Sequence, residues 1–180
     1  MRFCNECGAP VTLRVPAGDA LPRHVCDACG IVHYLNPKLI AGSVPVASDG
    51  RILLCRRGIE PRHGFWTLPA GFMELGETSA IAAERETREE ACAELGDLAL
   101  HSVVDVPQVS QVHLMFRGTL VGDRHAAGLE TLETRLFAAA AIPWDELAFA
   151  SVRLALEAYL ADRARDTFTV HALTVASARR

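Results

Sequence analysis

The sequence predicts an α/β fold in which a mixed β-sheet lies between helices and is preceded by a small cysteine-rich unit. Extended segments occur on both sides of one long helix that is rich in Ala and Glu, and a second helix lies near the end of the chain. Strands that flank a helix in this order favour a sheet packed between helical layers. Four of the six cysteines fall near the amino terminus, outside this pattern. The chain has 180 residues, half of them hydrophobic, which is enough for one good core.

These cysteines form two Cys-x-x-Cys pairs with eighteen residues between them, namely Cys4, Cys7, Cys26 and Cys29. This spacing is typical of a four-cysteine zinc site, and Gly8 and Gly30 directly follow the pairs, where the backbone must turn tightly around the metal. Two disulfides and a redox Cys-x-x-Cys are the alternatives, although no apolar signal segment directs the chain to an oxidising compartment. Because four thiolates leave no coordination position open, we expect the zinc to be structural.

The boundary between two domains is predicted at the dipeptide Asn36-Pro37, since a residue before proline is pushed toward extended backbone. Residues 1–35 have little apolar periodicity and should need their metal to fold, so we expect them to form a zinc ribbon. Residues 36–180 then form the second domain.

The second domain should open with a hairpin. Residues 38–47 and 51–57 are predicted strands joined by a turn at Asp49-Gly50. Residues 58–64 form a loop, and residues 65–69 a short strand that leads toward the helix.

The long helix follows from Ser79 onward, because this stretch has no Pro or Gly and is rich in Ala and Glu. After it, residues 98–106, 111–121 and 134–139 are predicted strands.

Pro143 suits the first position of a short helix over residues 144–147. Ser151 is expected to cap a final helix that runs to about residue 165. Its apolar side chains should be mostly buried, and they are Val152, Leu154, Leu156, Tyr159 and Leu160.

Three carboxylates share one face of the first helix. Glu86, Glu89 and Glu90 fall within an arc of about 100° at 3.6 residues per turn. Like charges at these spacings cost a helix roughly 0.2–0.5 kcal/mol per pair, and a hard divalent cation such as Mg²⁺ would relieve the repulsion. The helix physics alone leaves two readings open, a metal site and a solvated acidic face.

The spacing around these glutamates adds a resemblance. Gly71, five residues, Glu77, seven residues and then Arg85-Glu86-Thr87-Arg88-Glu89-Glu90 resembles the Nudix box, the signature of the Nudix hydrolase superfamily. The sequence departs from that pattern at Thr87, where the family usually has an aliphatic residue, and at Cys92, where it usually has Gly. A left-handed Cys would cost roughly 1–2 kcal/mol, so we expect the helix to continue past Cys92 and end near Gly96.

The resemblance implies a Nudix-type sheet between helices and a hydrolase that splits a diphosphate linkage with Mg²⁺ or Mn²⁺. It makes Glu86 and Glu90 the expected metal ligands, Glu89 a direct or water-bridged third, and a backbone carbonyl at Ala70 or Gly71 a further ligand. Arg85 belongs to the same catalytic set and is expected to pair with Glu77 rather than to touch substrate. Three candidates remain for the general base: Glu89, Glu130 and Glu133.

Within the superfamily, a zinc ribbon followed by this domain resembles the NADH diphosphatase branch. That branch carries a Ser-Gln-Pro-Trp-Pro-Phe-Pro-x-Ser segment after the box, which residues 107–113 here do not match. The chain is more similar to the plant FAD diphosphatase of the superfamily and its bacterial relatives, through residues 36–38, 53–57, 64–71, 105–107, 128–133 and 147–149. The resemblance therefore implies FAD, split to FMN and AMP, or ADP-ribose as substrate, with NADH as the alternative.

Substrate recognition should come from residues around the box. Arg56 or Arg57 would bind a phosphate, but strand alternation lets only one of the two point inward, and we select Arg56. Trp66 and Phe72 are the candidates for stacking on adenine or flavin, with Phe65 a third; each is also an ordinary core aromatic. Cys55 and Cys92 are expected to be small buried hydrophobes, and no role follows for the seven histidines.

The bulk composition excludes some classes. A net charge of −4 argues against broad nucleic-acid binding, and no apolar run approaches the roughly 20 residues that span a bilayer. We expect a cytoplasmic enzyme whose partner is a small dinucleotide, with a homodimer left open. The alternative from a different functional class is a Nudix-fold nucleotide sensor or nucleic-acid-binding module.

Overall fold

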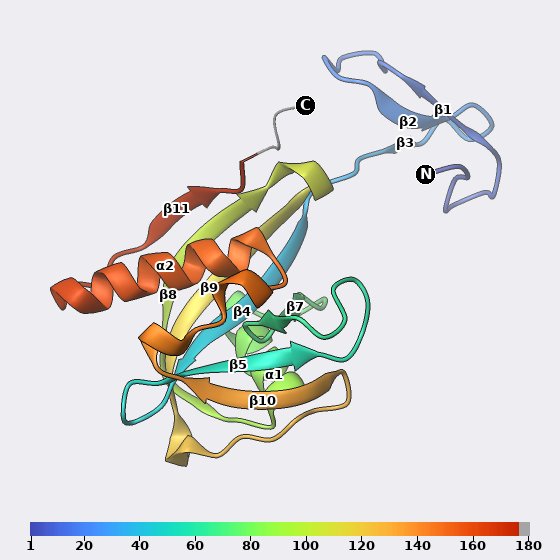
Figure 1. Cartoon of the computed structure of the whole chain (residues 1–180). Helices are drawn as coiled ribbons and strands as arrows, with labels where there is room; N and C mark the ends of the chain where they lie inside the picture. The colour runs from blue at the N-terminus through green and yellow to red at the C-terminus, as the bar shows by residue number, and fades with distance from the viewer. Residues whose placement is uncertain (177–180) are drawn as a thin grey trace. The chain divides into compact units, whose positions relative to one another are not determined.

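The computed structural model describes residues 1–176 and contains two compact units, which divide after residue 37 (Figure 1). The amino-terminal unit holds three antiparallel strands, β1 (Val11–Arg14), β2 (Arg23–Cys26) and β3 (Val32–His33), in the order β1-β2-β3. The sequence patterns predicted none of these short strands, because segments of two to four half-exposed residues carry no clear alternation.

The second unit is built on one mixed sheet. Its strands are β4 (Lys38–Val46), β5 (Ile52–Arg57), β6 (Trp66–Thr67), β7 (Ala70–Phe72), β8 (Leu95–Val106), β9 (Gln111–Leu120), β10 (Thr131–Phe137) and β11 (His171–Thr174). The main path runs β10-β5-β4-β9-β8-β11, with β6 beside β5 and β7 beside β4. The pairs β4–β9 and β8–β11 are parallel and the other pairs are antiparallel, so the predicted mixed sheet is confirmed.

Two helices cover the two faces of this sheet, α1 (Ser79–Ala91) and α2 (Ala150–Arg165). Alternate residues of β5 show the two layers, since Leu53 and Cys55 pack with α1, whereas Ile52 and Leu54 pack with α2. Figure 1 shows α2 in front of the sheet and α1 behind it. Short 3₁₀ turns complete the unit at Pro107–Val109, Val121–Asp123, Ala139–Ala141 and Trp144–Glu146.

The end of α1 differs from the prediction. The helix stops at Ala91, and Cys92 adopts the left-handed conformation with φ 47° and ψ 35°, its N–H bonded to the Arg88 carbonyl. The chain then enters β8 at Leu95, so the predicted extension to Gly96 is wrong. The ladder of β8 with β9 and the backbone hydrogen bonds that residues 126 and 128 make to the end of α1 outweigh the local cost of the left-handed Cys.

Three further expectations also fail at element ends. Ser151 does not cap α2, because the helix starts at Ala150 and Phe149 is the capping residue, its carbonyl accepting from the Arg153 N–H. Pro143 precedes the short turn at Trp144–Glu146 instead of opening it. Cys92 is exposed, whereas Cys55 is buried as expected.

Candidate functional site

Arg85 joins the loop before α1 to the carboxylates of the helix. Its Nε and Nη2 donate to the two carboxylate oxygens of Glu77 at 3.1 and 2.8 Å, and Nη2 also donates to the Phe72 carbonyl at 3.1 Å. Its Nη1 donates to Glu86 at 2.7 Å and to Glu89 at 3.2 Å. The hydrogen bond from Arg85 lowers the pKa of Glu77. The pairing of Arg85 with Glu77 expected from the sequence is therefore present, and the same guanidinium organises two helix carboxylates.

Glu86 is packed against the backbone of β7. A Cβ added to Gly71 would lie only 2.4 Å from the carboxylate atoms of Glu86, so a residue with a side chain would have to displace that carboxylate. Glu86 is 9% exposed, and its burial raises its pKa. Gly71 thus creates the space that the carboxylate fills.

Glu90 lies one helical turn further along and also faces β7. The Ala70 N–H donates to Glu90 Oε2 at 3.3 Å. Burial raises the pKa of Glu90 to about 7, and the negative charge of Glu86 contributes in the same direction. Two desolvated carboxylates that repel each other fit a hard divalent cation, whose charge would stabilise the ionised form of both.

Glu89 differs from its two neighbours, because its side chain is 58% exposed and is held only through Arg85. Across residues 1–176, groups of three or more ligand atoms within 4.8 Å of one another occur at the four cysteines and at His101, Asp162 and His171, but not at the helix glutamates. Glu86 and Glu90 therefore form the buried part of the acidic site, and Glu89 lies at its solvent edge.

The departure from the family pattern at Thr87 has a partner. Thr87 is buried, donates to the Ala83 carbonyl at 2.7 Å, and lies 2.7 Å from Ser43 Oγ on β4. Since the Thr87 proton is used on Ala83, Ser43 is the donor between the two hydroxyls. A polar pair replaces an apolar contact without leaving either hydroxyl unsatisfied.

The loop before β10 packs against the end of α1. The Gly128 N–H donates to the Glu90 carbonyl at 3.1 Å, and a Cβ at Gly128 would lie 1.7 Å from the Glu89 carbonyl oxygen. This close approach brings Glu130 near enough for its charge to raise the pKa of Glu90 slightly. Glu133, in contrast, is paired with Arg135. Of the two loop candidates for the general base, Glu130 is the one whose charge acts on Glu90.

The two adjacent arginines of β5 point to different surroundings. Arg57 carries the charge that lowers the pKa of Glu90. Arg56 donates through Nε to the Gly64 carbonyl at 2.9 Å and lies 3.8 Å from Glu133. The Arg57 charge thus acts on Glu90, while its Nε donates to the Pro61 carbonyl at 2.8 Å and its guanidinium lies 5.1 Å from the Phe149 ring centroid. The sequence pattern selected Arg56, and a phosphate contact remains a prediction for either arginine. Alternation along the strand predicts that the two differ, but it does not tell which one faces the helix.

Of the aromatic candidates, Trp66 lies in the core and Phe72 at the surface. Trp66 is 4% exposed and packs edge-on against Phe137, with ring centroids 4.9 Å apart, which leaves no face for a substrate ring. Phe72 is 47% exposed, and the Lys38 ammonium lies 5.0 Å from its ring centroid. A stacking role remains a prediction for Phe72, and the burial of Trp66 disfavours one there.

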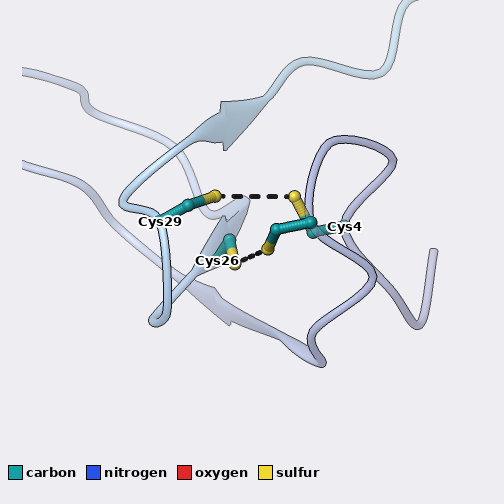
Figure 2. Close-up of side chains that lie close together, drawn as sticks. Cys4, Cys26 and Cys29 are labelled. Carbon is teal, nitrogen blue, oxygen red and sulfur yellow. Dashed lines mark hydrogen bonds between the residues drawn. The ribbon is translucent and has the colours of Figure 1, made fainter.

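The four predicted zinc ligands converge in the amino-terminal unit, and Figure 2 labels three of them, Cys4, Cys26 and Cys29. Cys4 and Cys29 Sγ lie 3.7 Å apart, and Cys7 and Cys26 Sγ lie 3.5 Å apart, close to the separation of about 3.8 Å that a tetrahedron with Zn–S bonds of 2.3 Å requires. All four thiols are free. The backbone N–H of Cys29 lowers the pKa of Cys26 to about 7, whereas the hydrogen bond with the Cys26 sulfur raises the pKa of Cys29 to about 12. Of this pair, Cys26 is the thiol that ionises first.

The backbone around these cysteines is shaped for a metal. Gly8 and Gly30 have φ of 74° and 76°, and their N–H groups donate to the carbonyls of Cys4 and Cys26. These are the tight turns that the glycines predicted. His33, which the sequence did not single out, lies with Nε2 3.3 Å from Cys4 Sγ. The residues present therefore fit a structural zinc ion.

Comparison with known families and structures agrees with both units. Residues 2–35 match the family described as Nudix N-terminal, a zinc ribbon, and residues 37–160 match the NUDIX domain family. A crystal structure of a Nudix hydrolase from Nitrosomonas europaea is 43% identical with a TM-score of 0.91, over 97% of this chain and 99% of that chain. A Nudix-family protein from Enterococcus faecalis, at 19% identity and a TM-score of 0.64 over 76% of this chain and 66% of that one, shares the fold.

Two curated relatives match over about half of this chain. The NAD-capped RNA hydrolase NudC of Chromobacterium violaceum is 35% identical over 54% of this chain and 34% of its own length. The human mitochondrial NAD(P)H pyrophosphatase NUDT13 is 31% identical over 56% of this chain and 27% of its own length. The match thus spans about a third of the length of these relatives or less. Since the NUDIX model covers most of the chain and includes both the acidic helix and its supporting strand, this protein belongs to the NUDIX domain family and carries that family's amino-terminal zinc ribbon.

Proposed function

We propose that this protein is a metal-dependent diphosphatase that hydrolyses the diphosphate linkage of a dinucleotide to two monophosphates. The observation that carries the proposal is the burial of Glu86 and Glu90 against Gly71 and Ala70, which sets two carboxylates close enough to repel each other in a position that a divalent cation would stabilise. Membership of the NUDIX family and relatives named as pyrophosphatases or capped-RNA hydrolases support the same reaction.

The residues of the acidic site would have separate roles in metal binding, positioning and proton transfer. Glu86 and Glu90 would hold Mg²⁺ or Mn²⁺, with Glu89 as a third ligand at the solvent edge and the Gly71 carbonyl as a backbone ligand. When bound, such an ion would neutralise charge on the diphosphate and favour ionisation of the attacking water. Arg85 keeps Glu86 and Glu89 oriented, which makes it a positioning residue. Glu130, or Glu89, accepts the proton of the attacking water.

Substrate choice follows from contacts around the two groups that flank the diphosphate. Arg57, whose charge lowers the pKa of Glu90, is suited to one phosphate, and Phe72 offers a half-exposed ring for stacking. The resemblance to the FAD diphosphatase group favours FAD, with ADP-ribose as a second substrate. The names of the curated relatives favour a nicotinamide dinucleotide, free or at the end of an RNA chain. Free thiols arranged for zinc fit a reducing compartment such as the cytoplasm.

The reaction is tested by replacing Glu90 with Gln. Turnover with Mg²⁺ should fall by roughly three orders of magnitude, while the fold is retained because the change also removes a like-charge repulsion. Glu84→Gln on the same helix is the matched control and should keep full activity. Near-normal activity in Glu90→Gln would remove Glu90 from the metal site, and loss of activity in Glu84→Gln as well would show that the effect is not specific to Glu90.

The substrate is tested by comparing kcat/KM for FAD, ADP-ribose, NADH and NAD-capped RNA on the same preparation. Overlapping activities are expected, because one extra apolar contact discriminates by only about 1–3 kcal/mol. FAD or ADP-ribose should lead. A clear preference for NADH or for capped RNA would show that the segment at residues 107–113 does not exclude the nicotinamide substrates.

A further inference from the structure

A second group of metal-ligating side chains lies on the other face of the sheet, away from the acidic helix. His101 on β8, Asp162 on α2 and His171 on β11 bring their ligand atoms within 4.8 Å of one another. His101 and Asp162 are fully buried, and His171 is partly buried. None of the three takes part in the diphosphatase site proposed above.

His101 presents an unused lone pair. Its Nε2 lies 3.2 Å from the Ala155 carbonyl of α2, and because a carbonyl only accepts, this nitrogen carries the proton. Nδ1 is then an acceptor, and it is one of two buried side-chain polar atoms without a partner among residues 1–176, the other being Ser102 Oγ. An unsatisfied buried polar atom costs about 1–3 kcal/mol, so the position of Nδ1 requires an explanation.

A β-bulge sets the position of the His101 side chain. In the ladder with β9, Leu100 pairs with Phe116 and Ser102 pairs with Met115, so His101 is the extra residue of a β-bulge. Bulges redirect side chains and are over-represented beside functional sites. The ring of His101 meets that of His171 edge-on at a centroid distance of 5.3 Å.

Asp162 and His171 are already oriented toward each other. His171 Nε2 lies 2.7 Å from Asp162 Oδ2, the Thr169 N–H donates to the same oxygen at 3.1 Å, and Arg165 donates to Oδ1 at 2.9 Å. These donors hold an ionised carboxylate at a fully buried position. A carboxylate fixed by backbone and guanidinium donors is a preorganised ligand.

We propose that His101, Asp162 and His171 form a binding site for a divalent transition-metal ion of the zinc class, separate from both the cysteine site and the glutamate site. Two imidazoles with one carboxylate suit Zn²⁺ and its neighbours, whereas Mg²⁺ prefers oxygen ligands. The Nε2–H of His101 on the Ala155 carbonyl is the outer hydrogen bond that a metal-bound histidine normally makes. Three protein ligands leave a fourth position for water.

Metal binding at this site displaces one proton. The Nε2–Oδ2 separation of 2.7 Å between His171 and Asp162 is that of a hydrogen bond, shorter than the roughly 3.3 Å between two ligands of tetrahedral zinc. The proton between them passes to solvent as the cation enters, and His101 Nδ1 supplies the third bond. The ion would then tie β11, the edge strand of the sheet, to both α2 and β8.

The experiment measures zinc stoichiometry on the full-length chain. Protein with one zinc in the cysteine site is held in excess Mg²⁺, which occupies the glutamates, and titrated with Zn²⁺ by calorimetry, with elemental analysis after dialysis. A second equivalent should bind, and it should raise the Tm. His171→Ala and His101→Ala should weaken this second binding by more than about 100-fold, whereas His63→Ala on an exposed loop should not.

His101 is buried, so its variant needs a check that it folds, which circular dichroism supplies. His171 is partly buried, with 22% of its side chain exposed, and its variant carries the test if the other fails to fold. Histidine ¹⁵N–¹H spectra give a second readout, since the His101 Nδ1 resonance should shift on zinc addition. Absence of a second equivalent, or a second equivalent that both histidine variants retain, would overturn the proposal and leave the cluster as an Asp–His hydrogen bond between α2 and β11.

Discussion

At the scale of single residues, the acidic site depends on a glycine, Gly71, which has no side chain. Gly71 has an ordinary backbone conformation, so its role is to leave space rather than to permit an unusual turn. The carboxylate of Glu86 fills that space, and Arg85 donates a hydrogen bond to it. The box pattern named these residues from sequence alone, because they lie close along the chain. It could not show that the charge of Arg57 acts on Glu90, since that depends on which face of β5 packs on the helix.

Replacing Gly71 with Ala should therefore disable the site without unfolding the protein. The new Cβ would lie 2.4 Å from the Glu86 carboxylate and would push it out of place, lowering kcat/KM with Mg²⁺ by about 100-fold or more. Gly96→Ala is the control, because its Cβ would meet only Val121 at 3.9 Å. Steady-state kinetics of both variants measure the loss of activity, and thermal melts show whether the fold is retained. Normal activity in Gly71→Ala would mean that Glu86 is not held where the metal binds.

The buried Glu90 also predicts how the metal-free protein responds to pH. Its pKa is about 7 in the folded state, whereas an unfolded glutamate titrates near 4.3. Between these values the folded state binds a proton that the unfolded state has lost, so stability falls as the pH rises from about 4.5 to about 7, by an amount on the order of 3 kcal/mol.

Urea unfolding without Mg²⁺ at pH 5, 6, 7 and 8 measures this slope. Both tryptophans, Trp66 and Trp144, lie in the second unit, so their fluorescence reports its unfolding. Glu90→Gln should flatten the slope and Glu84→Gln should keep it. An equally steep slope in Glu90→Gln would assign the proton to another group.

At the scale of elements, the interiors of strands and helices were predictable, but several of their ends were not. Residues 38–46 and 79–91 carry clear periodicity or composition, and both form as expected. The end of α1 at Cys92 is set by hydrogen bonds from residues 126 and 128, which are distant in sequence. Strand β11 is only four residues long. It pairs with residues 102–105 of β8, which are far away in the sequence, so no local pattern indicates it.

Cys92 offers a test of this account of the helix end. At φ 47° a glycine avoids the steric cost of a side chain, so Cys92→Gly should stabilise the second unit by up to about 1 kcal/mol. Cys92→Ser keeps the side chain and should bring no gain. Urea midpoints from tryptophan fluorescence compare the two. Equal stabilities would mean that the backbone at this position carries no penalty.

At the scale of the whole molecule, two units of very different construction share one chain. The second unit has a broad apolar core on both faces of its sheet. The amino-terminal unit buries few apolar side chains beyond its cysteines, and several others stay exposed, among them Phe3, Leu13 and Tyr34. A unit of 37 residues with so little core lies below the size at which hydrophobic burial alone stabilises a fold.

Among described residues, no helix is long and apolar enough to cross a bilayer.

Zinc should therefore fold the first unit and leave the second unaffected. Cys26→Ser removes one of four thiolates, and since the binding energy at such a site is folding energy, residues 1–37 should lose their NMR dispersion. The tryptophan-detected urea midpoint of the second unit should not move, because both reporters lie outside the ribbon. Elemental analysis at low zinc should give about one tightly bound ion per wild-type chain at the cysteines and none there in the variant. Two disulfides found by mass spectrometry in non-reduced protein would contradict the zinc assignment, and a ribbon that stays folded in Cys26→Ser would show that its three short strands suffice without metal.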